Sequence, residues 1–254
     1  MNKSKGTALV TGGAERLGKA IANARAQAGY DIALHYNSSA QAAEETAVSL
    51  RQHGVACDIF QLNLMDVTAV SPFMQRVQQR FPNLNLLVNS ASAYTQATVA
   101  DTTPTIFDTQ LNVNLRAPFF LSQAFAAQVN SGNIINIIDN KVGFNQFEYA
   151  AYLLSKKMLV EFTKMAAVEF APNVRVNGVS PGVVLPAKSR SDEYVQWRIQ
   201  GIPLKMQGEP NHITAAILSL LQNEFMTGQI LTVDGGESLT NVGQNAAQFD
   251  QEKI

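Results

Sequence analysis

A tyrosine and a lysine separated by one helical turn are the first residues in this sequence whose types and spacing suggest chemistry. Tyr152 and Lys156 lie in the segment FEYAAYLLSKKMLVEF, where a helix would place both side chains on one face. An ammonium group near a phenol favours the phenolate, so we expect the pKa of Tyr152 to fall from about 10 toward a range that allows proton transfer near neutral pH. The same spacing also occurs on solvated helix faces. Tyr149 is the weaker candidate, because Leu153 rather than a cation follows it after one turn.

The segment VTGGAERLG at positions 10–18 has the form of a glycine-rich turn between a strand and a helix. Gly12 and Gly18 frame this turn, where backbone N–H groups and the helix dipole favour a pyrophosphate. Arg16 occupies the position where a second glycine is expected, and its guanidinium is predicted to lie beside the pyrophosphate. Taken by itself, the motif is also compatible with an ordinary glycine-rich turn.

The end of the next predicted strand, LHYNSS, bears on the type of dinucleotide. An acidic residue here would accept hydrogen bonds from the 2′-hydroxyl of NAD and repel the 2′-phosphate of NADP. Asn37, Ser38 and Ser39 follow Tyr36 without any negative charge, which favours NADP(H). Two features count against a preference for NADP(H). This turn contains no Lys or Arg, and Glu15 in the glycine loop would lie near a 2′-phosphate. One further strand ends at Asn63, which is predicted either to contact the adenine or to cap the strand end.

The elements that must position these residues alternate along the chain. Short β-branched or apolar runs are separated by longer stretches of helical periodicity, the pattern of a parallel sheet with helices on both faces. The predicted strands span residues 7–12, 31–36, 57–63, 84–91, 133–139, 174–181 and 229–235. We therefore predict an α/β fold, a single Rossmann-like, doubly wound domain over residues 1–254 that ends in a polar tail at 241–254.

The first predicted helix illustrates the pattern within one unit. Leu17, Ile21, Ala24 and Ala28 lie on one helical face and are predicted to pack on the sheet, and Gly29 marks the end of the helix.

Composition excludes several classes of partner. Lys and Arg total 19 against 20 Asp and Glu, so no net charge favours nucleic acid or an anionic membrane. No window approaches 18 uninterrupted apolar residues, and the amino terminus lacks the apolar run of a signal peptide. The lone cysteine, Cys57, cannot form an internal disulfide and is expected to be a small buried residue, which favours a cytoplasmic protein. Small molecules are the expected partners, and no metal ligand set is predicted.

Taken together and in order, these motifs resemble those of the short-chain dehydrogenase/reductase family. The resemblance runs from Thr7 to Gly236 and includes NSAS at 89–92, VNL with Asn114, PG at 181–182 and VDGG near the end. It implies that Tyr152 is the acid, that Lys156 binds the nicotinamide ribose, and that Asn114 holds a proton-relay water. It extends the predicted cofactor-binding set to Leu17, Leu64, Asn89, Ala91, Ser92, Pro181 and Gly182.

Asp139 departs from that family, most of whose members have a serine thirteen residues before the tyrosine. A carboxylate facing a carbonyl oxygen would repel the charge that develops during hydride transfer to a ketone. A carboxyl group bonded to a tyrosine, its pKa raised by desolvation, can instead hold or relay a proton for a ring nitrogen. Asp139 is therefore predicted to serve the reduction of a C=N bond. The alternative is an aspartate that caps the next turn.

Arg16 and Asp139 together resemble the pteridine reductase branch of the family, which reduces pterins and folates with NADPH. Arg16 is then expected to reach a planar, acceptor-rich ligand stacked on the nicotinamide. Ser92 and Tyr94 match two further positions of that branch, so the resemblance implies a pterin site lined by Arg16, Ser92, Tyr94, Asp139 and Tyr152. The bacterial dihydromonapterin reductases fit about as well. Ser38 replaces an arginine of the protozoan enzymes, and the region after Tyr94 is shorter.

Two segments outside these motifs complete the predicted site and assembly. Residues 183–204 occupy the position of the family's substrate loop, where Leu185 or Trp197 is predicted to form a lid; the alternative for Trp197 is packing on the surface of the fold. The resemblance implies a homotetramer with the apolar helix at 150–170 as one interface. Met158, Val160, Phe162 and Met165 would cover that interface, although burial on the sheet would account for some of them.

The predicted function is NADPH-dependent transfer of hydride to a C=N bond of a dihydropterin or dihydrofolate. Tyr152, Lys156, Asp139 and Asn114 are predicted to manage the proton. One alternative is a carbonyl reductase that acts on a 3-oxoacyl or other ketone substrate. An alternative of another class is a regulator that senses NADP(H) without turnover.

Overall fold

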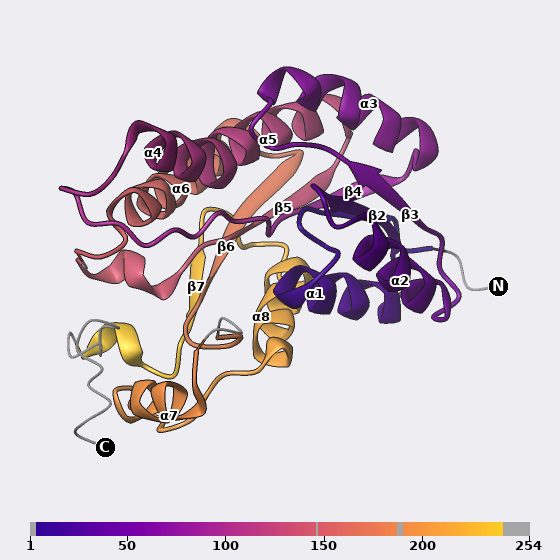
Figure 1. Ribbon diagram of the computed structural model, residues 1–254. Helices are drawn as coiled ribbons and strands as arrows, with labels where there is room; N and C mark the ends of the chain where they lie inside the picture. The colour runs from indigo at the N-terminus through magenta and orange to yellow at the C-terminus, as the bar shows by residue number, and fades with distance from the viewer. Residues whose placement is uncertain (1–3, 146, 187–189, 241–254) are drawn as a thin grey trace.

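Seven parallel strands form one sheet in the order β3-β2-β1-β4-β5-β6-β7 (Figure 1). The structure is a computed structural model that describes residues 4–145, 147–186 and 190–240. This sheet confirms the predicted α/β fold. The strands are β1 Thr7–Val10, β2 Asp31–Tyr36, β3 Cys57–Gln61, β4 Leu84–Asn89, β5 Gly132–Ile137, β6 Val174–Pro181 and β7 Ile230–Val233.

Two of the predicted strands, β2 and β6, have the predicted bounds, and the others are shorter. In β3, β4 and β5 the predicted strand runs two residues past the observed end. The extra residues, 62–63, 90–91 and 138–139, continue the chain beyond the carboxyl edge of the sheet. A sequence pattern does not mark where strand pairing stops, because the chain continues past the last paired residue. These extensions carry residues of the candidate site.

Helices cover both faces of the sheet (Figure 1). On one face the core contains Phe73, Phe125 and Leu121, all fully buried. On the other face it contains Ile21, Leu50 and Ile217. The first face is covered by α3 Val70–Arg80, α5 Ala117–Gln128 and α6 Ala150–Glu169, with α4 Pro104–Leu111 beside α6; the second is covered by α1 Arg16–Gln27, α2 Ala40–Arg51 and α8 Pro210–Gln222.

Helix α1 turns a face to the sheet that coincides only in part with the predicted one. Its fully buried positions are Gly18, Ile21, Ala22, Arg25 and Ala26. Of the predicted positions, Ile21 is fully buried, Leu17 is partly buried and packs on the core, and positions 24 and 28 are partly exposed. The buried face of α1 includes Gly18 because this residue packs against the backbone of Gly12 and Gly13 in the glycine loop. Gly29 has a φ of 89° directly after the helix, as predicted for a helix-ending glycine.

Near the carboxyl edge of the sheet, α7 Asp192–Gln200 and the short 3-10 turn Glu237–Leu239 are joined by a buried ion pair. Arg198 donates to Glu237 at 2.6 Å, and Glu237 also accepts from Asn140 at 2.9 Å. Ser191 caps the amino end of α7 by accepting from the backbone N–H of Tyr194. These contacts hold three distant segments of the chain beside one another.

The remaining predictions about single residues have mixed outcomes. Cys57 is buried in β3 within the core, as expected, and burial raises the pKa of its thiol to about 12. Phe162 is buried in the core of its own chain, whereas Met158 and Met165 on α6 are exposed. Within the described ranges, no helix is long and apolar enough to cross a membrane. The predicted tail at 241–254 lies outside the described residues.

Candidate active site

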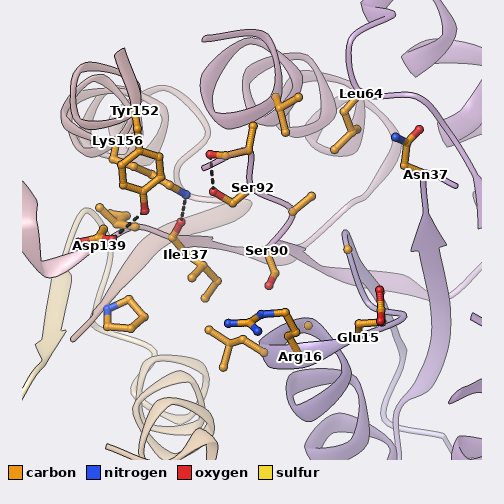
Figure 2. A pocket seen from close by; sticks show the side chains of 18 of the residues that line it. Glu15, Arg16, Asn37, Leu64, Ser90, Ser92, Ile137, Asp139, Tyr152 and Lys156 are labelled. Atoms are coloured by element: carbon orange, nitrogen blue, oxygen red, sulfur yellow. Dashed lines mark hydrogen bonds between the residues drawn. The ribbon is translucent and has the colours of Figure 1, made fainter. Parts of the chain in front are cut away.

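A cavity of about 640 Å³ opens at the carboxyl edge of the sheet. The glycine loop after β1 and the extensions of β3, β4 and β5 line it, together with the first turns of α6 and the segment after β6. Figure 2 shows Tyr152, Lys156 and Asp139 at one end of this cavity and Asn37 and Glu15 at the other. Carboxyl ends of parallel strands are where ligands bind in open α/β sheets.

The glycine loop is packed so closely that side chains are excluded at its two ends. A Cβ on Gly18 would lie 2.1 Å from the carbonyl oxygen of Gly12, and a Cβ on Gly12 would lie 3.0 Å from the Cα of Ala91. Gly12 has a φ of 62°. The backbone therefore approaches the cavity without side chains in the way, as a pyrophosphate requires.

Arg16 stands where a glycine was expected, and its backbone adopts a left-handed conformation that favours glycine. Its φ is 51°, a left-handed conformation that costs a residue with a side chain roughly 1 kcal/mol. The side chain extends across the cavity toward the end that holds Asp139 and Tyr152 (Figure 2). Its Nη2 donates to the backbone carbonyl of Leu185 and, at 3.3 Å, to that of Pro186. Arg16 thus ties the start of the predicted substrate loop to the glycine loop.

His35, in β2, is a residue of the site that we did not predict. Its Nδ1 accepts a hydrogen bond from the N–H of Gly12 and its Nε2 donates to the carbonyl of Leu62, both at 3.0 Å. The ring is 1% exposed, and burial lowers the pKa of His35 to about 4, although the bond to Leu62 opposes the shift. The neutral imidazole therefore holds the first glycine of the loop in place.

Thr11 performs a similar task between β1 and β4. Its hydroxyl accepts from the N–H groups of Ser90 and Ala91 at 2.9 and 3.0 Å and donates to the carbonyl of Val88. One buried side chain thus joins the glycine loop to the strand extension that forms the cavity floor.

Tyr152 and Asp139 are directly bonded. The Tyr152 hydroxyl donates to Oδ2 of Asp139 at 2.7 Å (Figure 2). Burial, and then the adjacent Asp139 carboxylate, raise the pKa of Tyr152 well above its ordinary value. Our prediction of a lowered tyrosine pKa is therefore wrong in this structure, because the phenol is buried and its hydroxyl donates to a carboxylate. Tyr152 is held in its protonated form.

Lys156 lies on the same helical face, as its spacing predicted. Its Nζ is 5.9 Å from the centroid of the Tyr152 ring and donates to the carbonyl of Ile137 at 2.9 Å (Figure 2). The side chain is 3% exposed. Burial lowers the pKa of Lys156 to about 8, and Asp139 opposes that shift.

Asp139 caps the next turn, as one of our two interpretations predicted, and it also contacts the tyrosine, while its role in proton transfer stays a prediction. One oxygen, Oδ1, accepts from the backbone N–H of Lys141 at 2.9 Å and caps the 3-10 turn Asn140–Gly143. The other oxygen accepts from Tyr152. The cap fixes the orientation of the carboxyl group, and Asp139 lines the cavity.

Asn114 lies behind the cavity wall, in a π-helical segment at Asn112–Arg116 between α4 and α5. Its side chain accepts from the N–H of Ala93 at 2.8 Å and donates to the carbonyl of Ala93 and to Ser155. It also accepts from the hydroxyl of Ser92 at 3.2 Å. Asn114 therefore supports the chain after β4 and joins it to α6.

The end of the cavity near β2 holds Asn37 and Glu15, with Ser39 donating to Glu15 at 3.4 Å. Ser38 and Ser39 are exposed beside the cavity, and Tyr36 packs against the core. Asn63 lines the cavity and also accepts from the N–H of Met65, so its capping role is observed.

Most of the predicted site residues are brought together by the fold. The lining of this cavity includes Gly12, Arg16, Leu17, Gly18, Asn37, Asn63, Leu64, Ala91, Ser92, Asp139, Tyr152, Lys156, Pro181, Gly182 and Leu185. Tyr94 lines a neighbouring cavity that also contains Asp139 and Tyr152. Of the described residues that we predicted, six line neither cavity: Tyr36, Ser38, Ser39, Asn89, Asn114 and Trp197.

Besides Asn114 and Tyr36, two more of these six have structural roles. Asn89 is buried in β4 and donates to Asn136 of β5 at 2.8 Å. Trp197 packs against Tyr194 on α7 with ring centroids 5.9 Å apart, which agrees with the surface-packing alternative.

Several lining residues were missed besides His35. They are Met65, Ser90, Ala93, Thr109, Val113, Ile137, Ile138 and Val184. Ser90, Ile137 and Ile138 lie at or just past the carboxyl ends of strands, so the parallel-sheet pattern alone would have indicated them. The others have apolar or small side chains without a chemical signature.

The arrangement fits an NADP(H) dinucleotide. The close approach at Gly12 and Gly18 keeps side chains out of the turn, and α1 begins there with first-turn N–H groups that have no acceptor within the helix and suit a pyrophosphate. The reactive end of the cavity holds a protonated tyrosine, a carboxyl group and a buried lysine. Such a set can bind a ribose and transfer a proton.

Comparisons with known proteins agree with this geometry. The sequence profile of the family described as "Enoyl-(Acyl carrier protein) reductase" matches residues 12–238. The 3-oxoacyl acyl-carrier-protein reductase FabG of Staphylococcus epidermidis is 30% identical over 244 residues, which cover 93% of this chain and 99% of FabG.

One similar solved structure is FolM alternative dihydrofolate reductase 1 from Brucella canis, complexed with NADP. It superposes with a TM-score of 0.89 at 29% sequence identity, and the match covers 93% of this chain and 95% of the FolM chain. The FolM protein from Brucella suis, also in complex with NADP, has a TM-score of 0.89 at 28% identity and covers 98% of each chain. The matched profile, these likenesses over nearly the whole chain and the paired tyrosine and lysine show that this chain belongs to the short-chain dehydrogenase/reductase family of oxidoreductases.

Proposed function

We propose that this protein is an NADPH-dependent reductase of a C=N bond in a dihydropterin or dihydrofolate. The observation that carries the proposal is the hydrogen bond from Tyr152 to Asp139 at the reactive end of the cavity. The likeness to the FolM proteins, whose titles describe alternative dihydrofolate reductases with NADP, supports it.

The chemistry divides between cofactor and chain. NADPH supplies the hydride to the carbon of the C=N bond, and the chain supplies the proton that the nitrogen gains. Tyr152 is protonated and directed at Asp139, so the pair carries a proton at the cavity. When Tyr152 gives up its proton, the Asp139 carboxyl can pass a replacement from solvent. Lys156 lies beneath the tyrosine and is placed to stabilise the phenolate that remains.

The same pair disfavours a ketone substrate. Reduction of a ketone develops negative charge on oxygen, and the Asp139 carboxylate beside Tyr152 would repel that charge. A ring nitrogen that is protonated before the hydride arrives ends neutral and develops no such charge.

The cofactor would occupy the cavity along its length. Gly12, Gly18 and Arg16 would hold the pyrophosphate, and Asn37 the adenosine ribose. Lys156 would bind the nicotinamide ribose. Asn114, through Ser92 and Ala93, would keep the wall beside the nicotinamide in place.

A second candidate is reduction of a 3-oxoacyl thioester. The identity of 30% with the Staphylococcus epidermidis FabG over nearly the whole chain favours it. In that case Asp139 would serve only as the cap of the turn after β5.

Oxidation of NADPH by the purified protein separates these functions. We expect turnover with 7,8-dihydrobiopterin or 7,8-dihydrofolate and little with a 3-oxoacyl thioester. The substitution Asp139→Ser should lower kcat with the pterin by about 100-fold, the usual range for loss of a proton-transfer group. Asp108→Ser, which removes an exposed carboxylate of α4, is the control and should leave kcat unchanged.

Three outcomes would contradict the proposal. Preferred turnover of the thioester would favour the second candidate. A near-normal pterin rate in Asp139→Ser would remove the role of that carboxyl group. Tight binding of NADPH without consumption of any substrate would indicate a sensor of the nucleotide.

The exposed apolar face of α6 supports one proposal about assembly, a homotetramer. Met158 and Met165 are 48% and 69% exposed, and with Phe119 of α5 they line an apolar groove. Light scattering should give the molar mass of a tetramer for the wild type and a smaller species for Met165→Glu. A monomeric wild type would contradict this assembly.

A further inference from the structure

A second cavity of about 640 Å³ adjoins the proposed nicotinamide end of the first. It extends outward from the catalytic residues to the start of α7. Residues shared by the two cavities are Arg16, Ser92, Asp139, Tyr152, Gly182, Val184 and Leu185. A ring bound beside Tyr152 would therefore direct its substituent into this outer cavity.

Stacked aromatic rings form one wall of the outer cavity. Tyr94 stacks on Tyr149 with centroids 4.6 Å apart and planes at 16°. The edge of Tyr94 also meets Tyr152 at 4.6 Å, with the rings nearly perpendicular. This wall is flat and carries hydroxyl groups, so it suits a planar or extended substituent.

The charges around the outer cavity are unbalanced. Among the described residues, its lining has four cationic side chains, Arg16, Lys141, Arg190 and Arg198, and a single carboxylate, Asp139. Arg198 is neutralised by its buried ion pair with Glu237.

The carboxylate itself is already engaged with Tyr152 and with the N–H of Lys141. Arg16 donates to backbone carbonyls. Lys141 and Arg190 remain without an ion pair to any carboxylate in the described part of the chain.

Lys141 and Arg190 are held against the aromatic wall. Nζ of Lys141 donates to the hydroxyl of Tyr94 at 3.3 Å and lies 5.0 Å from the centroid of Tyr149. Arg190 donates to the hydroxyl of Tyr149 at 3.3 Å, and its guanidinium lies 4.5 Å from the centroid of Tyr194. The two cations therefore lie on the same aromatic pair.

Both side chains are half-buried, and burial lowers the pKa of Lys141. Partial removal of a cation from water without a counter-ion is unfavourable, and a bound anion relieves that penalty. The aromatic faces offset only part of it.

We propose that the outer cavity binds an anionic group on the substituent of the substrate's ring, held by Lys141 and Arg190. The inference rests on the proposed function and narrows its substrate class to pterins with a carboxylate or phosphate on the side chain. Neutral polyhydroxyalkyl pterins would bind through the ring alone.

Steady-state kinetics with three reducible pterins tests this inference. The substrates are 7,8-dihydrofolate, which carries carboxylates, a 7,8-dihydropterin with a phosphorylated side chain, and neutral 7,8-dihydrobiopterin. The proteins are wild type, Lys141→Gln, Arg190→Gln and the double variant. Lys5→Gln, an exposed lysine at the opposite edge of the sheet, is the matched control.

We expect the double variant to raise KM for an anionic substrate about tenfold or more, with kcat nearly unchanged and KM for dihydrobiopterin within about twofold. Added salt should raise KM for the anionic substrate in the wild type and have little effect in the double variant. A larger effect on dihydrofolate would identify a carboxylate, and a larger effect on the phosphorylated pterin would identify a phosphate.

Equal losses with all three substrates would overturn the inference, because they would mean that the two cations only maintain the shape of the cavity. Unchanged KM values would overturn it as well. Either result leaves the proposed function standing, since dihydrobiopterin is still reduced. A wild type that reduces none of the three pterins would overturn the proposed function and this inference together.

Discussion

His35 provides the most specific prediction about how this fold responds to pH. The ring accepts from the N–H of Gly12 through Nδ1, and that bond requires an unprotonated nitrogen. Protonation would remove the acceptor and introduce a charge where the side chain is 1% exposed. Acid should therefore loosen the loop that is proposed to bind the pyrophosphate.

The magnitude follows from the lowered pKa of His35, about 4 in the folded protein against an ordinary value of 6.5. Between these values the unfolded chain binds more protons than the folded one, so the free energy of unfolding rises with pH and is lost as pH falls from 6.5 toward 4. The difference between 6.5 and about 4 corresponds to about 3.4 kcal/mol in full and to about 2.5 kcal/mol at pH 4.5.

Urea unfolding at pH 7.5 and pH 4.5 measures this contribution. Wild type should lose about 2.5 kcal/mol more than His35→Gln over this interval, because glutamine does not titrate. His53→Gln is the matched control, since His53 is exposed and bonded only to the side chain of Asn23, and it should behave like wild type.

Equal losses of unfolding free energy in wild type and His35→Gln would refute this account of His35. If His35→Gln does not fold, NMR titration of the imidazole in the wild type provides the same test. A pKa near 6.5 for His35 would then contradict the buried, neutral ring.

Three further predictions concern the cavity. Gly18→Ala should weaken NADPH binding by about tenfold or more in a fluorescence titration, since the new Cβ would lie 2.1 Å from the carbonyl oxygen of Gly12; unchanged affinity would show that the loop tolerates a wider turn. Glu15→Gln should tighten NADPH binding severalfold with little effect on NADH, because it removes a carboxylate from the end where the 2′-phosphate is expected; equal effects on both would place Glu15 away from that phosphate. Lys156 has its pKa lowered to about 8, so the unfolded chain binds more protons between pH 8 and 10.5 and stability rises with pH through that window. Lys156→Met should therefore abolish turnover. It should also raise the free energy of unfolding at pH 7 by up to about 3 kcal/mol, from which about 1 kcal/mol is subtracted for the lost hydrogen bond to Ile137. A gain in unfolding free energy that persists at pH 10.5 would contradict this account of Lys156.

The pattern of residues was sufficient to predict the order of elements and the main chemical groups. Alternating apolar runs and helical stretches predicted the seven strands, and the spacing of Tyr152 and Lys156 predicted a shared helical face. These features depend on interactions within a few residues, so local sequence encodes them. The glycines of the loop were recognisable for the same reason, because their conformation is a local property.

Proton placement depended on contacts between distant segments. Asp139 and Tyr152 belong to different elements, and burial of the phenol together with its 2.7 Å hydrogen bond to Asp139 reverses the expected direction of the tyrosine pKa. The distances from Lys156 to the Tyr152 ring and to the Ile137 carbonyl likewise depend on how α6 packs beside β5.

The sequence by itself thus determined the parallel sheet, the glycine-rich turn after its first strand and the candidates for the acid–base groups. Tertiary structure alone decided that His35 supports the glycine loop, that Arg16 ties it to Leu185, and that Lys141 and Arg190 meet at one aromatic wall. Burial and electrostatics depend on which distant groups become neighbours, and no local pattern records that choice.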